Sequence, residues 1–170
     1  MIRKAVAEDI PSLKKITEAC ARHMIAQGIF QWNEHYPSIA VFKRDIEQEN
    51  MYAFELDGVL VGCVMLSFEK DEFYDSIPWQ TKEQKHLYVH RLAVHPDVQG
   101  NGIAQKLMDF GENLAQENGC LSVRLDTFSK NPRNNIFYQK RNYQLTGEVF
   151  FEQKNPHPFY CYEKVFDNKD

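Results

Sequence analysis

The sequence has no excess of basic residues. Its 20 lysine and arginine side chains are outnumbered by 24 aspartate and glutamate side chains, which leaves a net charge of −4. A domain that binds the phosphate backbone of a nucleic acid normally shows the opposite balance, with basic residues gathered on one face. We therefore expect no nucleic-acid partner.

Long apolar runs are also missing. The longest covers residues 59–66 and is interrupted by Gly62, whereas a helix that spans a bilayer needs about 18 or more apolar residues. The opening MIRKAVAEDIPS alternates charged and apolar residues and lacks the apolar centre of a secretory signal. The sequence predicts a soluble, cytoplasmic protein that does not interact with membranes.

The cysteines do not form a recognisable motif. Cys20, Cys63, Cys120 and Cys161 are scattered without CxxC spacing, which argues against a zinc site or a thioredoxin-like redox pair. We interpret them as reduced and mostly buried thiols, and we expect no bound metal.

The chain does contain enough apolar material for one core. It has 170 residues, of which 43% are hydrophobic and 13% aromatic. One domain usually takes roughly 100 to 200 residues, so residues 1–170 are predicted to form a single domain.

Hydrophobic periodicity predicts an alternation of strands and helices. Helical spacing begins after Asp9, a predicted N-cap, and again after Ser38, while Asp57-Gly58 between two apolar runs indicates a hairpin. Segment 69–85 fits no period and is predicted to be a functional loop with one helical turn. Helices are predicted at 10–28, 38–50, 103–118 and 134–140, and strands at 2–6, 51–57, 59–68, 86–95, 120–126, 144–151 and 159–166.

A glycine-containing loop links the strand at 86–95 to the helix that follows. In Gln99-Gly100-Asn101-Gly102, backbone N–H groups lie at the positive end of a helix dipole, an arrangement that binds anions. The loop matches neither the dinucleotide-binding fingerprint nor the nucleotide-binding P-loop, which disfavours NAD and ATP. Taken alone, the segment is equally compatible with a simple turn before the helix.

The segment RLAVHPDVQGNGIAQKLM resembles motif A of the GCN5-related N-acetyltransferases (GNAT), whose pattern is [Q/R]xxGx[G/A] after a hydrophobic strand. A second similarity lies downstream, where Asn131 is followed seven residues later by Tyr138, as in motif B of that family. Asn142-Tyr143 replaces the commoner Gly-Phe. The opening IRKAVAEDIPSL is similar to the first strand and helix of the family, so the resemblance covers nearly the whole chain.

The resemblance implies the GNAT acyl-CoA N-acyltransferase fold, an α/β architecture with a mixed, mostly antiparallel sheet of six to seven strands and about four helices. It also implies acetyl-CoA as co-substrate, with the diphosphate on the glycine loop and the pantetheine arm paired to a strand edge. The residues expected to bind the coenzyme are Leu92, Ala93, Val94, Gln99, Gly100, Asn101, Gly102, Ile103, Ala104 and Asn131. Asn131 has an equally good alternative role as a helix cap.

Two residues are candidates for proton transfer. By resemblance, Tyr138 is the general acid that protonates the departing thiolate; the alternative is an aromatic side chain that only packs on the sheet. His90 lies on the strand from which the family supplies a base, although it could equally be a half-buried strand residue. His86 and Tyr88 share its face, unless a bulge intervenes, and could relay protons through water.

Aromatic and acidic residues gather in two segments that depart from the family pattern. Trp32, Tyr36, Tyr74 and Trp79, with acids at 34, 69, 71, 72 and 75, favour a cationic acceptor, although the acids could form only a solvated surface. We predict direct acetyl transfer to a primary amine of a small molecule or peptide, by a monomer or homodimer. The alternatives are a non-catalytic acyl-CoA-binding module and the same fold with a longer acyl donor.

Overall fold

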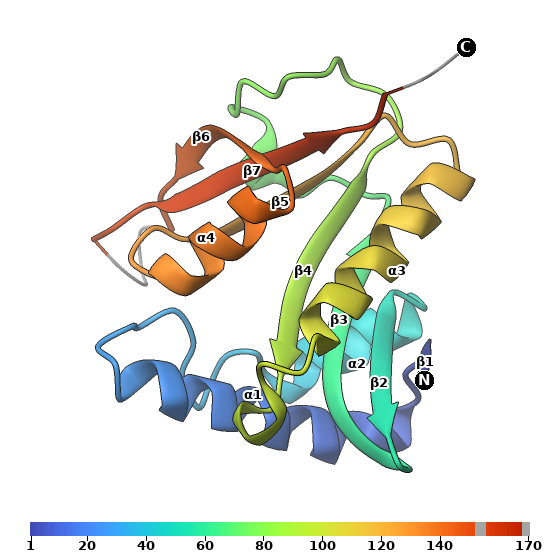
Figure 1. Ribbon diagram of the computed structural model, residues 1–170, viewed down its shortest axis with the longest axis vertical. Helices are drawn as coiled ribbons and strands as arrows, with labels where there is room; N and C mark the ends of the chain where they lie inside the picture. The colour runs from blue at the N-terminus through green and yellow to red at the C-terminus, as the bar shows by residue number, and fades with distance from the viewer. Residues whose placement is uncertain (152–155, 168–170) are drawn as a thin grey trace. The chain divides into compact units, whose positions relative to one another are not determined.

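The structure, a computed structural model, describes residues 1–151 and 156–167. Four α-helices and seven β-strands follow one another in this part of the chain in the order β1, α1, α2, β2, β3, β4, α3, β5, α4, β6, β7 (Figure 1). They form two compact units. The first comprises Met1–Leu66 and His90–Phe110, and the second comprises Ser67–Val89 and the described residues from Gly111 onward. The single domain over 1–170 stays a prediction, and its residues 152–155 and 168–170 lie outside the description.

The first unit is built on an antiparallel hairpin. β2 (Met51–Leu56) pairs with β3 (Val59–Ser67), and β1 (Ile2–Lys4) pairs with the other edge of β2. Asp57 and Gly58 both have positive φ, 52° and 77°, as the two central residues of a type I′ hairpin turn require. The predicted hairpin is therefore confirmed, while β1 is two residues shorter than expected.

Two helices complete the N-terminal half of this unit. In α2 (Ile39–Glu47), Ser38 Oγ accepts the Val41 N–H at 3.1 Å, so the predicted N-cap is confirmed. The cap predicted for α1 (Ile10–Ile25) is wrong. Asp9 makes no side-chain cap, because its carboxylate accepts the Arg3 guanidinium at 2.7 and 2.9 Å and the Val6 N–H at 2.8 Å.

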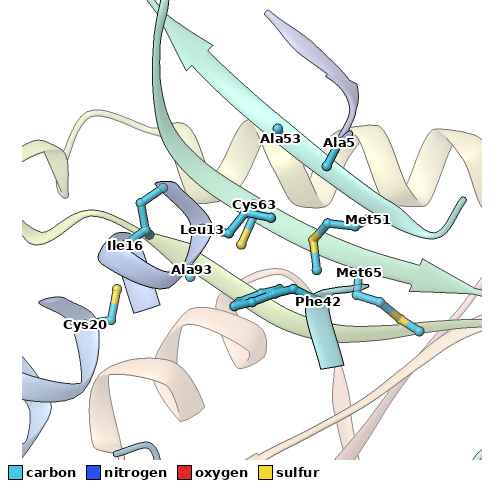
Figure 2. Close-up of a cluster of buried hydrophobic side chains, with 10 residues drawn as sticks. All are labelled: Ala5, Leu13, Ile16, Cys20, Phe42, Met51, Ala53, Cys63, Met65 and Ala93. Atoms are coloured by element: carbon cyan, nitrogen blue, oxygen red, sulfur yellow. The ribbon is translucent and has the colours of Figure 1, made fainter. Parts of the chain in front are cut away.

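Sulfur and small aliphatic side chains fill the core of the first unit. Figure 2 shows the Phe42 ring with the sulfur-bearing side chains of Met51, Met65, Cys63 and Cys20. Phe42, Met51 and Cys63 are fully buried. The remaining members of this cluster are Ala5, Leu13, Ile16, Ala53 and Ala93.

β4 (Leu87–Val94) leads into the glycine loop and then into α3 (Ile103–Glu117). The strand is divided between the units after Val89. Gly119, with a φ of 72°, follows the end of α3, as is common where a helix ends in a left-handed glycine.

The second unit holds the C-terminal strands and α4 (Pro132–Lys140), which packs on β5 (Figure 1). β5 (Ser122–Phe128) pairs in parallel with Leu87–Val89 and antiparallel with β7 (Phe159–Val165), and β6 (Gln144–Val149) pairs antiparallel with β7. β5 begins and ends two residues later than the predicted strand, and α4 begins two residues earlier. The strand order β1-β2-β3-β4-β5-β7-β6 confirms the predicted mixed, mostly antiparallel sheet.

The four cysteines are all buried and unpaired, as predicted. Within residues 1–151 and 156–167, none of the helices combines the length and the apolar character needed to cross a membrane.

Candidate active site

The glycine loop of the first unit has a defined backbone path. It opens with a single 3-10 turn, Pro96–Val98, in which His95 Nδ1 accepts the Asp97 N–H at 3.2 Å. Gly100 and Gly102 then adopt φ of 85° and 78°, values that side chains other than glycine rarely tolerate. Asn101 Nδ2 donates to the Val98 carbonyl at 2.9 Å and closes the loop on itself.

The loop delivers the chain into the first turn of α3. Lys106 N donates to the Gly102 carbonyl at 3.0 Å, so the N–H groups of Ile103 and Ala104 precede the first helical hydrogen bonds. A Cβ built on Gly100 or Gly102 would meet no protein atom within 4 Å. Open glycine backbone at the positive end of a helix fits a diphosphate group.

The last residues of β4 were predicted to pair with the pantetheine arm of the coenzyme. The Val94 carbonyl accepts both the Cys20 thiol at 3.2 Å and Gln99 Nε2 at 2.9 Å. Because a carbonyl has two lone pairs, this oxygen is saturated and has no capacity left for a ligand. Leu92 is half-buried and Ala93 is buried.

Arg91 interrupts β4 with a φ of 51°. Its guanidinium binds the fully buried Asp45 carboxylate of α2 in a bidentate pair at 2.7 and 2.8 Å, and it donates to the Tyr36 hydroxyl at 3.3 Å. Sequence patterns could not reveal this pair, because 46 positions separate its members. The break also means that His90 and Leu92 do not follow simple strand alternation.

His90 is half-buried, and its pKa is lowered to about 3. Loss of water is the main cause, and the positive charges of Arg91 and Arg44 add to it. The imidazole is therefore neutral at pH 7, and it is a weaker base than an ordinary histidine.

Tyr138 lies in α4 with 5% of its surface exposed, and its ring contacts Phe137, Tyr143 and Tyr162. Among the described residues, nothing forms a hydrogen bond with its hydroxyl. Burial, followed by the negative charge of Asp126, raises the pKa of this hydroxyl above its usual range. The phenol thus keeps its proton at neutral pH.

Asn131 caps α4. Its Oδ1 accepts the Asn134 N–H at 3.1 Å, and Pro132 occupies the first helical turn. The alternative role of Asn131 as a helix cap is therefore confirmed. Its contact with pantetheine stays a prediction.

The four aromatic residues predicted to contact the acceptor divide between the units. In the first unit, Trp32 packs against the core and Tyr36 binds Arg91. In the second, Tyr74 is 1% exposed and donates its hydroxyl to Asp126 Oδ2 at 2.8 Å. Trp79 Nε1 donates to the Tyr74 carbonyl at 3.0 Å, and the Trp79 ring stacks on the Arg124 guanidinium.

His86 and Tyr88 belong to a buried polar network in the second unit. His86 contacts Ser122 Oγ and the Lys82 carbonyl, each at 2.9 Å, and Tyr88 accepts from Arg124 at 3.3 Å. These bonds account for both ring nitrogens of His86, so the contribution of His86 is structural. Nowhere in the described part of the chain do three or more His, Cys, Asp or Glu side chains gather in a way that could hold a metal.

Comparison with known proteins is consistent with these features. Residues 12–143 match the model of the acetyltransferase (GNAT) family. The chain is 27% identical over 159 residues to an S-alkylcysteine N-acetyltransferase of Bacillus subtilis, a match that covers 91% of this chain and 82% of the relative.

Solved structures agree in fold. A GNAT-family acetyltransferase of Streptococcus agalactiae superposes with a TM-score of 0.81 at 25% identity, over 98% of this chain and 95% of the other. The structure of yncA of Salmonella typhimurium, which contains acetyl-CoA, superposes with a TM-score of 0.71 at 16% identity, over 100% and 95% of the two chains. The chain belongs to the GNAT acetyltransferase family and is an N-acetyltransferase.

Proposed function

We propose that this enzyme transfers the acetyl group of acetyl-CoA directly to a primary amine of a small molecule or peptide. In that reaction the amine nitrogen bonds to the acetyl carbon, the carbon–sulfur bond breaks, and the thiolate takes a proton. An acceptor that arrives as an ammonium ion loses two protons, so one is released for each turnover.

The donor half of the proposal depends on the glycine loop. Backbone N–H groups from Gln99 to Ala104 would bind the diphosphate, since the two open glycines allow close approach. Leu92, Ala93 and Val94 would hold the pantetheine arm, without the Val94 carbonyl, which already accepts two hydrogen bonds. In addition to capping α4, Asn131 would contact the pantetheine arm.

Tyr138 is the proposed general acid, and its state is the observation that carries the proposal. It is a buried phenol whose hydroxyl has no hydrogen-bond partner in the described residues and whose pKa is raised. Such a group holds a proton that no protein acceptor competes for. Proton transfer to the thiolate needs only hydrogen-bond contact at the moment the carbon–sulfur bond breaks.

His90 is the proposed first acceptor of the amine proton. Because its pKa is lowered to about 3, it would pass the proton on at once rather than hold it. A chain of water molecules past His90 could accept the proton instead. The two routes predict different effects of replacing the imidazole.

Direct transfer is favoured over an acetyl-cysteine intermediate. Burial raises the pKa of the Cys20 thiol to about 11 and that of Cys63 to about 12, and it also raises the pKa values of Cys120 and Cys161. Protonated, buried thiols are poor nucleophiles. Four reduced cysteines also suit the reducing cytoplasm that we propose as the site of action.

The acceptor is proposed to be a small amine, as in the relative that acetylates S-alkylcysteine, with a peptide N-terminus as the alternative within the same chemistry. Trp32, Tyr36 and Trp79 are half-buried and could border its binding site. Tyr74 is too deeply buried for direct contact and would act through the group that it holds.

The test is coenzyme A release against a panel of S-methylcysteine, spermidine, tyramine and an alanine-initiated dipeptide. We expect at least one amine to be acetylated, with Tyr138→Phe lowering kcat ~100-fold and leaving acetyl-CoA binding unchanged. His90→Ala should lower kcat less. Binding of acetyl-CoA without turnover of any amine would favour the non-catalytic module. Higher turnover with longer acyl-CoA donors would identify one of these as the preferred donor.

A further inference from the structure

Three consecutive residues in the middle of β4 depart from the alternation of a regular strand. His90, Arg91 and Leu92 are half-buried, whereas the residues before and after them in β4 are buried. In a regular strand neighbouring side chains point to opposite faces, so three half-buried residues in a row indicate a change of direction. Arg91, with its positive φ of 51°, lies at the centre of this turn.

A left-handed turn is unfavourable at an arginine. The Cβ of any residue other than glycine opposes positive φ, and single left-handed residues are usually glycine, asparagine or aspartate. The chain nevertheless places a long, charged side chain at this position. Contacts of that side chain must therefore hold the backbone in its unfavourable conformation.

The Arg91 side chain uses all three of its guanidinium nitrogens within the first unit. Nε and Nη2 donate to the two oxygens of the Asp45 carboxylate at 2.7 and 2.8 Å, and Nη1 donates to the Tyr36 hydroxyl at 3.3 Å. Asp45 is fully buried, and the Arg91 side chain is 8% exposed. A bidentate pair fixes the orientation of both partners as well as their distance.

The backbone of the turn has contacts of its own. The Arg91 carbonyl accepts the Cys63 thiol of β3 at 3.6 Å, and the Val94 carbonyl accepts the Cys20 thiol of α1 at 3.2 Å. Two buried cysteines thus contact β4 at the turn and three residues beyond it. Side chains from α1, α2 and β3 together determine the course of the strand.

The turn separates residues with different proposed roles. His90, the proposed first acceptor of the amine proton, precedes it, and Leu92–Val94, which are proposed to hold the pantetheine arm, follow it. After loss of water, the charge of Arg91 is the next cause of the lowered pKa of His90, which indicates that the guanidinium lies close to the imidazole. The conformation of one residue therefore determines how the base and the thioester face each other.

We propose that Asp45 and Arg91 are positioning residues for acetyl transfer: their buried pair holds β4 in the left-handed turn that sets the angle between His90 and Leu92–Val94. This inference depends on the proposed acetyl transfer. Neither side chain needs to contact the reacting atoms. Loss of the pair would leave the substrates bound but misaligned, and a displacement of about 1 Å can slow a reaction ~100-fold.

The first test measures kcat for the best amine of the panel, and the Kd of acetyl-CoA by calorimetry, in Asp45→Asn. Asparagine keeps the size of the side chain but removes its charge and one acceptor oxygen. We expect kcat to fall ~10- to 100-fold, while the Kd of acetyl-CoA changes less than about three-fold because the glycine loop is intact.

The matched control is Asp9→Asn. It breaks another bidentate pair of the first unit, in which the Asp9 carboxylate accepts the Arg3 guanidinium at 2.7 and 2.9 Å. Because this pair lies away from β4 in the sheet, kcat should stay within about two-fold of the wild type.

The second test distinguishes the turn from the charges. Glycine adopts positive φ readily, whereas alanine opposes it, and both remove the guanidinium. When each is combined with Asp45→Asn, Arg91→Gly should therefore give a kcat ~5- to 10-fold higher than Arg91→Ala. A pair that contributed only to stability would give equal turnover per folded molecule in these two double variants.

Arg91→Lys decides the question if the other variants fail to fold. Lysine keeps the positive charge but cannot form the bidentate pair, so kcat should fall ~3- to 10-fold at an unchanged Kd of acetyl-CoA. A kcat within about two-fold of the wild type in Asp45→Asn or Arg91→Lys, or equal kcat values in the two double variants, overturns the positioning role and leaves the acetyl transfer intact. A wild type that acetylates no amine overturns both.

Discussion

The two compact units bury polar groups in different ways. The first has a core of aliphatic and sulfur-bearing side chains around Phe42, and it buries the Arg91–Asp45 pair at the point where β4 has positive φ. The second has a tyrosine-rich cluster and a buried network centred on Arg124 and Glu163, both 0% exposed. The buried ion pair of the first unit thus stabilises a local backbone irregularity. The buried network of the second unit connects several strands with segment 69–85.

The largest effect is expected from breaking the network of the second unit with Glu163→Gln. The Glu163 carboxylate accepts hydrogen bonds from the backbone of Gln80 and the side chains of Thr81, Ser122 and Arg124, at 2.6 to 2.9 Å. Glutamine has one acceptor oxygen and turns a donor toward these groups. We expect a loss of ~3–5 kcal/mol in the free energy of unfolding, measured by urea denaturation.

A loss below about 1 kcal/mol in Glu163→Gln would mean that Glu83, which is 3.4 Å from Arg124, compensates for the missing charge. In that case the contrast between the two units would be weaker than the contacts indicate.

Asp45→Asn is the corresponding change in the first unit. Asparagine can accept one of the two Arg91 hydrogen bonds, and the Tyr36 hydroxyl still accepts another. We expect a loss of ~3 kcal/mol in the free energy of unfolding. Hydrogen exchange should show a loss of protection in α2 and β3 for Asp45→Asn, and in β5 and β7 for Glu163→Gln. The same pattern in both variants would contradict the division into two units.

Alanine substitutions at two glycines distinguish the effect of backbone strain from an effect on coenzyme binding. Gly100 and Gly28 have similar φ, 85° and 77°, and a Cβ would meet no atom within 4 Å at either. Alanine at each position should therefore cost a similar ~1–2 kcal/mol of stability. Only Gly100→Ala should weaken acetyl-CoA binding, by ~10-fold in calorimetry, and an equal loss of affinity in Gly28→Ala would remove the loop from the donor site.

The last effect concerns His90 and is expected only at acidic pH. Its pKa is about 3 in the folded protein and near ~6.5 when unfolded. Between these values the unfolded chain binds more protons, so stability should fall as the pH drops below ~6.5. His90→Gln should flatten this dependence in urea unfolding curves, and an imidazole that NMR shows titrating with a pKa near ~6.5 in the folded protein would contradict it.

Features encoded within a few residues were predictable from the sequence. Asp57-Gly58 indicated the hairpin, Ser38 the start of α2, and Gly100 and Gly102 the loop before α3. Tyr138 was proposed from its spacing to Asn131, and its catalytic role stays a prediction. For the hairpin, the helix start and the loop, the physical cause is a φ value or a capping hydrogen bond within the same few residues.

Contacts between separate elements could not be predicted. The failed cap at Asp9 reflects competition from Arg3, and the pairing of Arg91 with Asp45 depends on α2 packing against β4. Clustered charge, as at 69–75, is visible in a sequence, whereas the bond from the Tyr74 hydroxyl to Asp126 joins residues 52 positions apart and is not.

The central claim is that the backbone from Gln99 to Ala104 binds the diphosphate of acetyl-CoA. Calorimetric titration with acetyl-CoA and with S-acetylpantetheine, which carries the same thioester and arm but no diphosphate, tests it directly. We expect acetyl-CoA to bind ~100-fold more tightly than S-acetylpantetheine, and Gly100→Ala to reduce this difference in affinity. Equal affinities for the two thioesters would contradict it.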